Sequence, residues 1–186
     1  MVKNPLIQEL NNIFDGKYLD YNASQIVEND IDCNGVPFTM SREIVVESLK
    51  MQHVVFRIDP NKVEIFPYFA RTKDLKKFCD FIIFAETDVD FLILLIEMKR
   101  SSGSPERQLE ISESFVDFVI KRAKLIGIDF DTKNVIIRKL GLKNKSISKK
   151  EVTKFYQNFH FDTNNYALEM GCNKIFLRQM FDAPVY

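Results

Sequence analysis

Three charged residues lie at the ends of two strongly apolar segments. Asp80 begins the first segment, Asp-Phe-Ile-Ile-Phe, whereas Glu97 and Lys99 end the second, Phe-Leu-Ile-Leu-Leu-Ile-Glu-Met-Lys. Both segments are rich in strand-forming residues, and the polar stretch 86–90 between them is typical of a hairpin loop. Because side chains alternate between the two faces of a strand, Glu97 and Lys99 point to the same face. The hairpin therefore predicts two carboxylates and a lysine at one edge of a sheet.

Two carboxylates that converge in this way repel each other unless a cation lies between them. Mg²⁺ takes oxygen ligands and keeps several waters, so Asp80, Glu97 and one backbone carbonyl suffice when a substrate phosphate completes the shell. The carbonyl of Met98, whose side chain points to the other face, is the candidate third ligand. Lys99 is placed to orient or deprotonate an attacking water and to offset charge on the phosphate. The pattern predicts metal-assisted phosphodiester hydrolysis, with Mg²⁺ or Mn²⁺ as cofactor.

Upstream of this hairpin, the sequence predicts one helix and several strands. Apolar residues at helical spacing mark the first segment, and the turn Asp59-Pro60-Asn61-Lys62 separates two strand-like segments. We expect a helix at 4–14, a loop with a short strand near Phe38 at 15–40, either a helix or a strand at 41–50, and strands at 53–58 and 63–69.

Downstream of the hairpin, Ser104-Pro105 is a strong helix start, because serine caps a helix and proline suits its first position. The helix is expected to run to about residue 126, where Gly127 ends it. A helix between two strands builds a crossover over a sheet face. The chain is therefore predicted to be α/β, with a mixed central sheet flanked by helices. The remaining expected elements are a strand at 134–140, a helix behind the capping box Ser148–Glu151 and a strand at 175–180.

The spacing of the charged residues resembles that of a known enzyme superfamily. Asp80, sixteen further residues and then Glu97-Met98-Lys99, on a hairpin followed by a helix and a strand, resemble the PD-(D/E)XK nucleases. This superfamily includes restriction endonucleases, Holliday-junction resolvases and RecB-like nuclease domains. The resemblance covers roughly residues 62–140 and implies an αβββαβ core of restriction-endonuclease type, with Mg²⁺ on Asp80 and Glu97 and with Lys99 in catalysis. Cys79 departs from the pattern, since proline is typical before the aspartate.

The same resemblance implies further site residues. Many members carry a glutamine early in the helix after the lysine, and Gln108 fits that placement. Some members place another acidic residue upstream. Glu9, Glu43 and Glu47 are the candidates here, with Glu43 or Glu47 preferred because their segment lies closer to the core strands. Basic residues beside the site and in the segment 133–154 are candidates for contacts with a nucleic-acid backbone: Arg100, Arg107, Lys143, Lys145 and Lys149.

Length and composition set the frame for this site. With 186 residues and 46% hydrophobic content, the chain is expected to form one domain over 1–186, with its core at about 41–140 and a C-terminal extension at about 141–186. The formal net charge is zero, so a nucleic-acid contact depends on a local patch or on a partner subunit. Three widely spaced cysteines argue against a disulfide framework and favour the cytoplasm. No signal peptide and no membrane span are expected.

These observations predict a small metal-dependent nuclease that acts on DNA in preference to RNA. By analogy with the superfamily, we expect a homodimer or a partner subunit, and a role in microbial defence or in the processing of mobile DNA. One alternative is a catalytically inactive module that keeps the fold and binds nucleic acid or a protein. Another is an RNA endonuclease similar to the viral cap-snatching enzymes, in which His53 would take the place of their upstream histidine.

Overall fold

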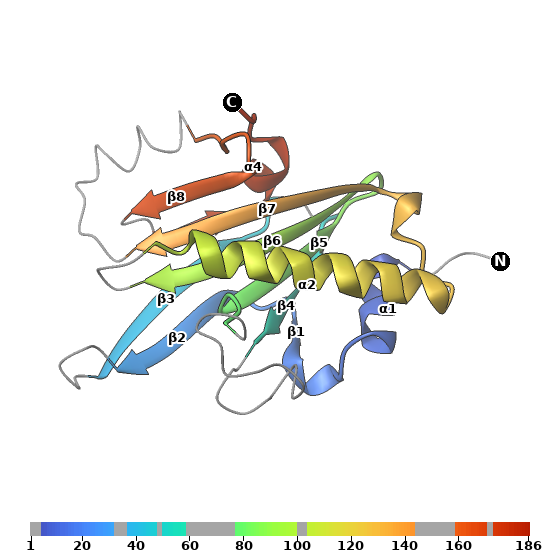
Figure 1. Ribbon diagram of the computed structural model, residues 1–186, viewed down its shortest axis with the longest axis horizontal. Helices are drawn as coiled ribbons and strands as arrows, with labels where there is room; N and C mark the ends of the chain where they lie inside the picture. Colours follow the sequence, from blue (N-terminus) through green and yellow to red (C-terminus); the bar gives the residue numbers. More distant parts are fainter. Residues whose placement is uncertain are drawn as a thin grey trace.

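Two sheets and a few helices make up the described part of the chain (Figure 1). The computed structural model describes residues 5–31, 37–47, 50–58, 77–99, 104–143, 159–170 and 173–186. The helical segments are α1 (Leu6–Glu9), α2 (Glu106–Leu125), α4 (Leu177–Asp182) and the 3₁₀ turns η1 (Leu10–Asn12), η2 (Gly16–Tyr18) and η3 (Phe130–Thr132). The strands are β1 (Leu19–Tyr21), β2 (Gln25–Ile31), β3 (Pro37–Val45), β4 (Gln52–Arg57), β5 (Phe81–Glu86), β6 (Asp90–Lys99), β7 (Asn134–Lys143), β8 (Tyr166–Met170) and β9 (Lys174–Phe176).

The larger sheet has six strands in the order β1-β4-β5-β6-β7-β8. Neighbours from β1 to β6 are antiparallel, whereas β7 joins β6 in parallel and β8 joins β7 in parallel. Helix α2 makes the crossover from β6 to β7. The smaller sheet pairs β2 with β3 in a hairpin and adds β9 in parallel. The expected α/β class with a mixed central sheet is therefore confirmed.

Strand β6 lies in the middle of the larger sheet and is buried on both faces. Leu92, Leu94 and Ile96 pack against residues of the smaller sheet and of α4. Phe91, Ile93 and Leu95 pack instead against α1 and α2. In Figure 1, α2 crosses one face of the larger sheet, as these contacts require. An apolar run without alternation is what a strand with two covered faces needs, and this part of the prediction is correct.

The structure corrects one upstream expectation and decides another that the sequence left open. Residues 15–40 are not mainly loop, because they form η2, β1, β2 and the beginning of β3. On β2, Gln25 and Asn29 face one side and Glu28 faces the other, so the sequence lacks the polar and apolar alternation that indicates a strand. The segment 41–50, for which helix and strand were both open, continues β3 as far as Val45, in keeping with its β-branched residues.

The elements near the N-terminus and the C-terminus also differ from those that the sequence predicts. The predicted helix 4–14 is shorter, with α1 passing into the 3₁₀ turn η1. The predicted strand 175–180 is wrong from Leu177 onward, because β9 stops at Phe176 and α4 follows. Leu177, Met180 and Phe181 recur at helical spacing and are all buried. The expected strand 63–69 and the helix behind Ser148 lie outside the described residues.

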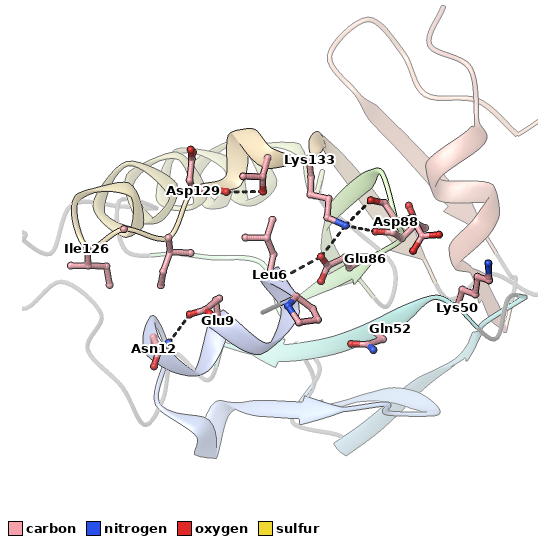
Figure 2. A pocket seen from close by; sticks show the side chains of 15 residues that line it. Leu6, Glu9, Asn12, Lys50, Gln52, Glu86, Asp88, Ile126, Asp129 and Lys133 are labelled. Carbon is pink, nitrogen blue, oxygen red and sulfur yellow. Dashed lines mark hydrogen bonds and ion pairs between the residues drawn. The ribbon is translucent and has the colours of Figure 1, made fainter. Parts of the chain in front are cut away.

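A buried carboxylate fastens α1 to the sheet at the turn of the β5–β6 hairpin. The Glu86 side chain accepts hydrogen bonds from the backbone N–H groups of Leu6, at 3.1 Å, and Ile7, at 2.9 Å. Lys133 lies 3.2 Å from the same carboxylate and also donates to the carbonyl oxygens of Thr87 and Asp88 (Figure 2). The Glu86 carboxylate and the Lys133 ammonium therefore each have several polar partners, as buried charges require.

Replacing Glu86 with alanine is expected to lower the free energy of unfolding by about 2–4 kcal/mol. The change removes the acceptor for two helix amides and leaves the Lys133 ammonium without its carboxylate. Urea unfolding measures the loss. Asp88→Ala in the adjoining loop is the control, because Asp88 is exposed, and its effect is expected to stay within about 0.5 kcal/mol. Similar losses for the two variants would show that the carboxylate does not hold α1.

Candidate active site

Asp80 and Glu97 approach each other at the open end of the β5–β6 hairpin. Phe81 pairs with Ile96 in the antiparallel ladder, and one further step along the register sets Asp80 opposite Glu97. Directly opposed residues of an antiparallel pair share a face of the sheet. The Asp80 Oδ2 atom accepts a hydrogen bond of 2.7 Å from the backbone N–H of Met98, which holds this carboxylate against the end of β6. The structure therefore brings the two predicted carboxylates together.

Glu97 is the most deeply buried charged side chain of this group, with 1% of the side chain exposed. One carboxylate oxygen, Oε1, forms an ion pair with Lys99 Nζ. The other, Oε2, is buried without a hydrogen-bond partner among the described residues. Burial and, after it, the negative charge of Asp80 together raise the pKa of Glu97 to about 8, against the opposing effect of Lys99. The ion pair with Lys99 thus offsets only part of the cost of burying this carboxylate beside Asp80.

Lys99 and Gln108 connect the end of β6 to the first turns of α2. Lys99 Nζ donates to Gln108 Oε1 at 2.6 Å, and Gln108 Nε2 donates to the carbonyl oxygen of Phe78 at 3.2 Å. With 27% of its side chain exposed, Lys99 remains reachable from solvent. The amide of Gln108 thus bridges the lysine and the segment that leads into Asp80, and Glu97, Lys99 and Gln108 form one network.

Local sequence explains why α2 begins at this place. The Ser104 hydroxyl accepts a hydrogen bond from the N–H of Glu106, and α2 is regular from Glu106 onward, one residue later than the sequence predicts. Gly141 on β7 is the register partner of Glu97. A Cβ atom at Gly141 would lie 2.5 Å from Pro105 Cγ, so the missing side chain lets the helix start sit directly over β7.

The donor set at the hairpin end suits a hard divalent cation. It consists of carboxylate oxygens, and one of them, Oε2 of Glu97, is buried and unsatisfied by the described protein groups. No group of three or more histidine, cysteine, aspartate or glutamate side chains gathers for a metal ion within the residues that the structure covers. The side chain of Met98 lies in the core of the other face, and its carbonyl remains a predicted ligand. The residues present fit a two-carboxylate magnesium or manganese site.

The three upstream acids considered from the sequence lie elsewhere. Glu9 binds Asn12 at the edge of the cleft beside α1, at the turn end of the hairpin (Figure 2). Glu43 forms an exposed ion pair of 3.0 Å with Lys174. Glu47 is exposed just beyond the end of β3. The structure gives none of the three a contact with Asp80 or Glu97.

Glu28 is the acidic residue that sequence reasoning missed. Its negative charge contributes to the raised pKa of Glu97, after the contributions of burial and of Asp80. Glu28 lies on β2 opposite Met40, whose side chain is buried, so it faces the inner side of the small sheet. Ile26 and Glu28 are two residues apart, so on a strand they share a face, and this spacing could have indicated that Glu28 points inward. The expectation of a loop at 15–40 left this possibility out.

Two of the five basic candidates are described. Arg107 is exposed in the first turn of α2. Lys143 ends β7 beside Lys99, its register partner in the parallel pair, so the two side chains share a face. Arg100, Lys145 and Lys149 lie outside the described residues. His53 is buried on β4 opposite Ala85, toward the turn end of the hairpin, and its Nε2 lies 2.9 Å from the carbonyl oxygen of Ala23.

The turn end of the hairpin borders a separate cleft of about 730 Å³ between α1 and the end of α2 (Figure 2). Its innermost charged residues, Glu86 and Lys133, are already engaged with each other and with the backbone. This cleft lies at the opposite end of β5 and β6 from Asp80 and Glu97.

No helix in the described ranges is long and apolar enough to cross a membrane. Comparisons with protein-family models, with curated proteins and with solved structures found no match to this chain. The geometry of the site is therefore the basis for the functional argument.

In the metal-free protein, raising the pH from about 4.5 to about 8 is expected to lower the free energy of unfolding. In this range the folded state holds a proton on Glu97 that the unfolded state has released, so alkaline pH favours unfolding. Glu97→Gln should reduce this decline, because glutamine does not titrate. Urea unfolding at several pH values in the presence of EDTA measures both slopes.

Glu110→Gln, at an exposed position of α2, is the matched control and should keep the wild-type slope. Identical slopes for the wild type and for Glu97→Gln would mean that Glu97 is not held in its neutral form.

Gly141→Ala is expected to displace the first turn of α2 and to lower the free energy of unfolding by about 1–3 kcal/mol. The new Cβ would meet Pro105 at 2.5 Å, and Leu168 and Tyr166 at 3.1 Å. Amide hydrogen exchange should become faster in this turn, in which the Leu109 N–H bonds to the Pro105 carbonyl. Gly16→Ala is the control, because the nearest atom to its Cβ is 3.9 Å away. Unchanged exchange in Gly141→Ala would refute the close approach.

Proposed function

We propose that this chain is a metal-dependent nuclease of the PD-(D/E)XK type that hydrolyses phosphodiester bonds, with DNA as its preferred substrate. One observation carries the proposal. Asp80 and Glu97 converge from adjacent strands, and the lysine two residues after Glu97 is held between that carboxylate and Gln108. The sequence order, the shared face and the hydrogen bonds all support the same set of four residues.

Asp80 and Glu97 would hold the ion, Mg²⁺ or Mn²⁺. The buried, unsatisfied Oε2 of Glu97 and the raised pKa of this group both support a cation at this position. When bound, the ion supplies Lewis-acid activation of a water molecule and of the phosphodiester. The hydrogen bond from the Met98 N–H fixes the Asp80 carboxylate beforehand, so little reorganisation is needed.

Lys99 would act on the reacting phosphate and its water. An ammonium group has three N–H donors, and the described partners of Lys99 are Glu97 and Gln108. The third donor is then free to contact a phosphate oxygen or the attacking water. Because Gln108 is itself bonded to the Phe78 carbonyl, the ammonium is held in one orientation toward the site. This restraint supports a role in orienting the nucleophile and in offsetting negative charge.

The polynucleotide would be held by local basic residues rather than by overall charge. The formal net charge is zero, so a long-range electrostatic attraction is weak. Lys143, the register partner of Lys99, and Arg107, in the first turn of α2, would supply the phosphate contacts near the site. Because so few basic residues would contact the polynucleotide, we expect a homodimer or a partner subunit to add binding surface.

Cleavage assays test this proposal. Purified protein is expected to cut plasmid or single-stranded DNA with Mg²⁺ or Mn²⁺ and to be inactive in EDTA. Asp80→Asn, Glu97→Gln and Lys99→Ala are each expected to reduce kcat by on the order of 100-fold, because each removes a ligand or a charge that acts on the reacting phosphate. RNA is assayed in parallel. Cleavage of RNA without cleavage of DNA would show that RNA, and not DNA, is the substrate.

Two further variants sharpen the assay. Glu43→Gln is the control, because this glutamate is exposed in an ion pair with Lys174, and full activity is expected. Glu28→Gln removes a charge that acts on Glu97 and is expected to weaken Mn²⁺ binding, measured by calorimetry. Nucleic-acid binding without cleavage under any condition would favour the inactive module. Equal losses in Glu43→Gln and Glu97→Gln would contradict the assigned site.

A further inference from the structure

Ser112 is a fully buried polar side chain in the apolar stripe of α2. Its neighbours on that stripe, Leu109 and Val116, pack into the core between α2 and the sheet. The Ser112 hydroxyl donates to the carbonyl oxygen of Gln108, one turn earlier, at 2.8 Å. The Ser112 Oγ atom in turn accepts a hydrogen bond of 2.8 Å from the backbone N–H of Cys79. A serine at this position therefore links the helix to the chain directly before β5.

Both bonds end next to the proposed site. Cys79 immediately precedes Asp80, and its amide is buried. Gln108 carries the side-chain amide that binds Lys99 on one side and the Phe78 carbonyl on the other. One turn of α2, from Gln108 to Ser112, thus bonds to two consecutive residues, Phe78 and Cys79, at the entrance to the strand that bears the aspartate.

The entrance to β5 depends on such bonds, because it precedes the regular ladder. The ladder with β6 begins at Phe81, and the Cys79 N–H donates to a side chain, Ser112, rather than to a neighbouring strand. A buried N–H without a partner is costly, and the chain would turn to find another acceptor. Such a turn would move the carboxylate of the next residue, Asp80, relative to Lys99 and Glu97.

We infer that Ser112 is a positioning residue for the proposed nuclease site, acting through the Cys79 N–H to set Asp80 at the correct distance from Lys99. The inference rests on the proposed function. Ser112 touches neither the ion nor the substrate, because its hydroxyl is enclosed between the helix and the strand entrance. Outer-shell hydrogen bonds of this kind hold metal-binding carboxylates in orientation.

Ser112→Ala, compared with the wild type, is the first test. The Mn²⁺ dissociation constant, measured by calorimetry, is expected to rise about 10-fold and kcat to fall about 10-fold. KM for DNA should change less than about twofold, because the basic contacts are untouched. Amide exchange at Cys79, followed by NMR, should become faster. All measurements are made at a temperature at which both proteins are fully folded.

Ser114→Ala is the matched control on the same helix. Ser114 is exposed, and its hydroxyl makes the same type of bond to the carbonyl of Glu110, at 3.3 Å, without a link to the sheet. Wild-type Mn²⁺ affinity and kcat are expected for this variant. If Ser112→Ala and Ser114→Ala behave alike while the wild type binds Mn²⁺ and cleaves DNA, the positioning role is overturned and the nuclease proposal stands.

Cys79→Pro tests the route of the effect. Proline lacks the N–H that Ser112 satisfies, so Ser112→Ala should lose most of its effect on Mn²⁺ affinity in the proline background. Additive effects in this double-mutant cycle would contradict a route through the Cys79 amide. A wild-type protein that neither binds Mn²⁺ nor cleaves nucleic acid would overturn the proposed function together with the inference.

A second pair of variants applies if Ser112→Ala or Cys79→Pro fails to fold. Ser112→Thr keeps the hydroxyl acceptor, whereas Ser112→Cys replaces it with a weaker acceptor. A higher Mn²⁺ dissociation constant for the cysteine variant than for the threonine variant supports the inference, and equal constants overturn it.

Discussion

The burial of Glu97 beside Asp80 is the constraint on which the arrangement of this end of the molecule depends. Two carboxylates on neighbouring strands, one of them almost fully removed from water, repel each other and lose hydration. Lys99 offsets part of this cost through its ion pair with Oε1 of Glu97. The other oxygen, Oε2, has no hydrogen-bond partner among the residues that the structure describes. The surrounding elements hold the two groups together despite the repulsion, and a divalent cation would complete the balance of charge.

A second buried glutamate on the same hairpin, Glu86, differs from Glu97 in how completely the protein satisfies its charge. Glu86, at the turn end, receives two helix amides and the ammonium of Lys133, and its role is to fasten α1. Glu97, at the open end, has an ion pair and an unsatisfied oxygen. Both are glutamates that end or nearly end an apolar strand. Their difference lies in whether the protein itself satisfies the charge.

Helix α2 serves the site through one close approach and a few hydrogen bonds. The absence of a side chain at Gly141 lets Pro105 sit over β7, which brings Gln108 within reach of Lys99. One turn later, Ser112 reaches the amide before Asp80. Both contacts come from the face of the helix that also packs Leu109 and Val116 into the core. Core packing and the orientation of the charged residues therefore depend on the same docking of the helix.

The sequence by itself determined β5, β6 and α2, and it singled out Asp80, Glu97, Lys99 and Gln108 as a candidate site, because these signals are local: long apolar runs, a Ser-Pro helix start and fixed spacing. Only the tertiary structure decided what depends on pairing between distant segments. The strands β1, β2 and β8, the charge of Glu28 near Glu97, the space at Gly141 and the bond from Cys79 to Ser112 all belong to this class. A half-polar strand carries little local pattern, and a hydrogen bond across 33 residues leaves none in either segment.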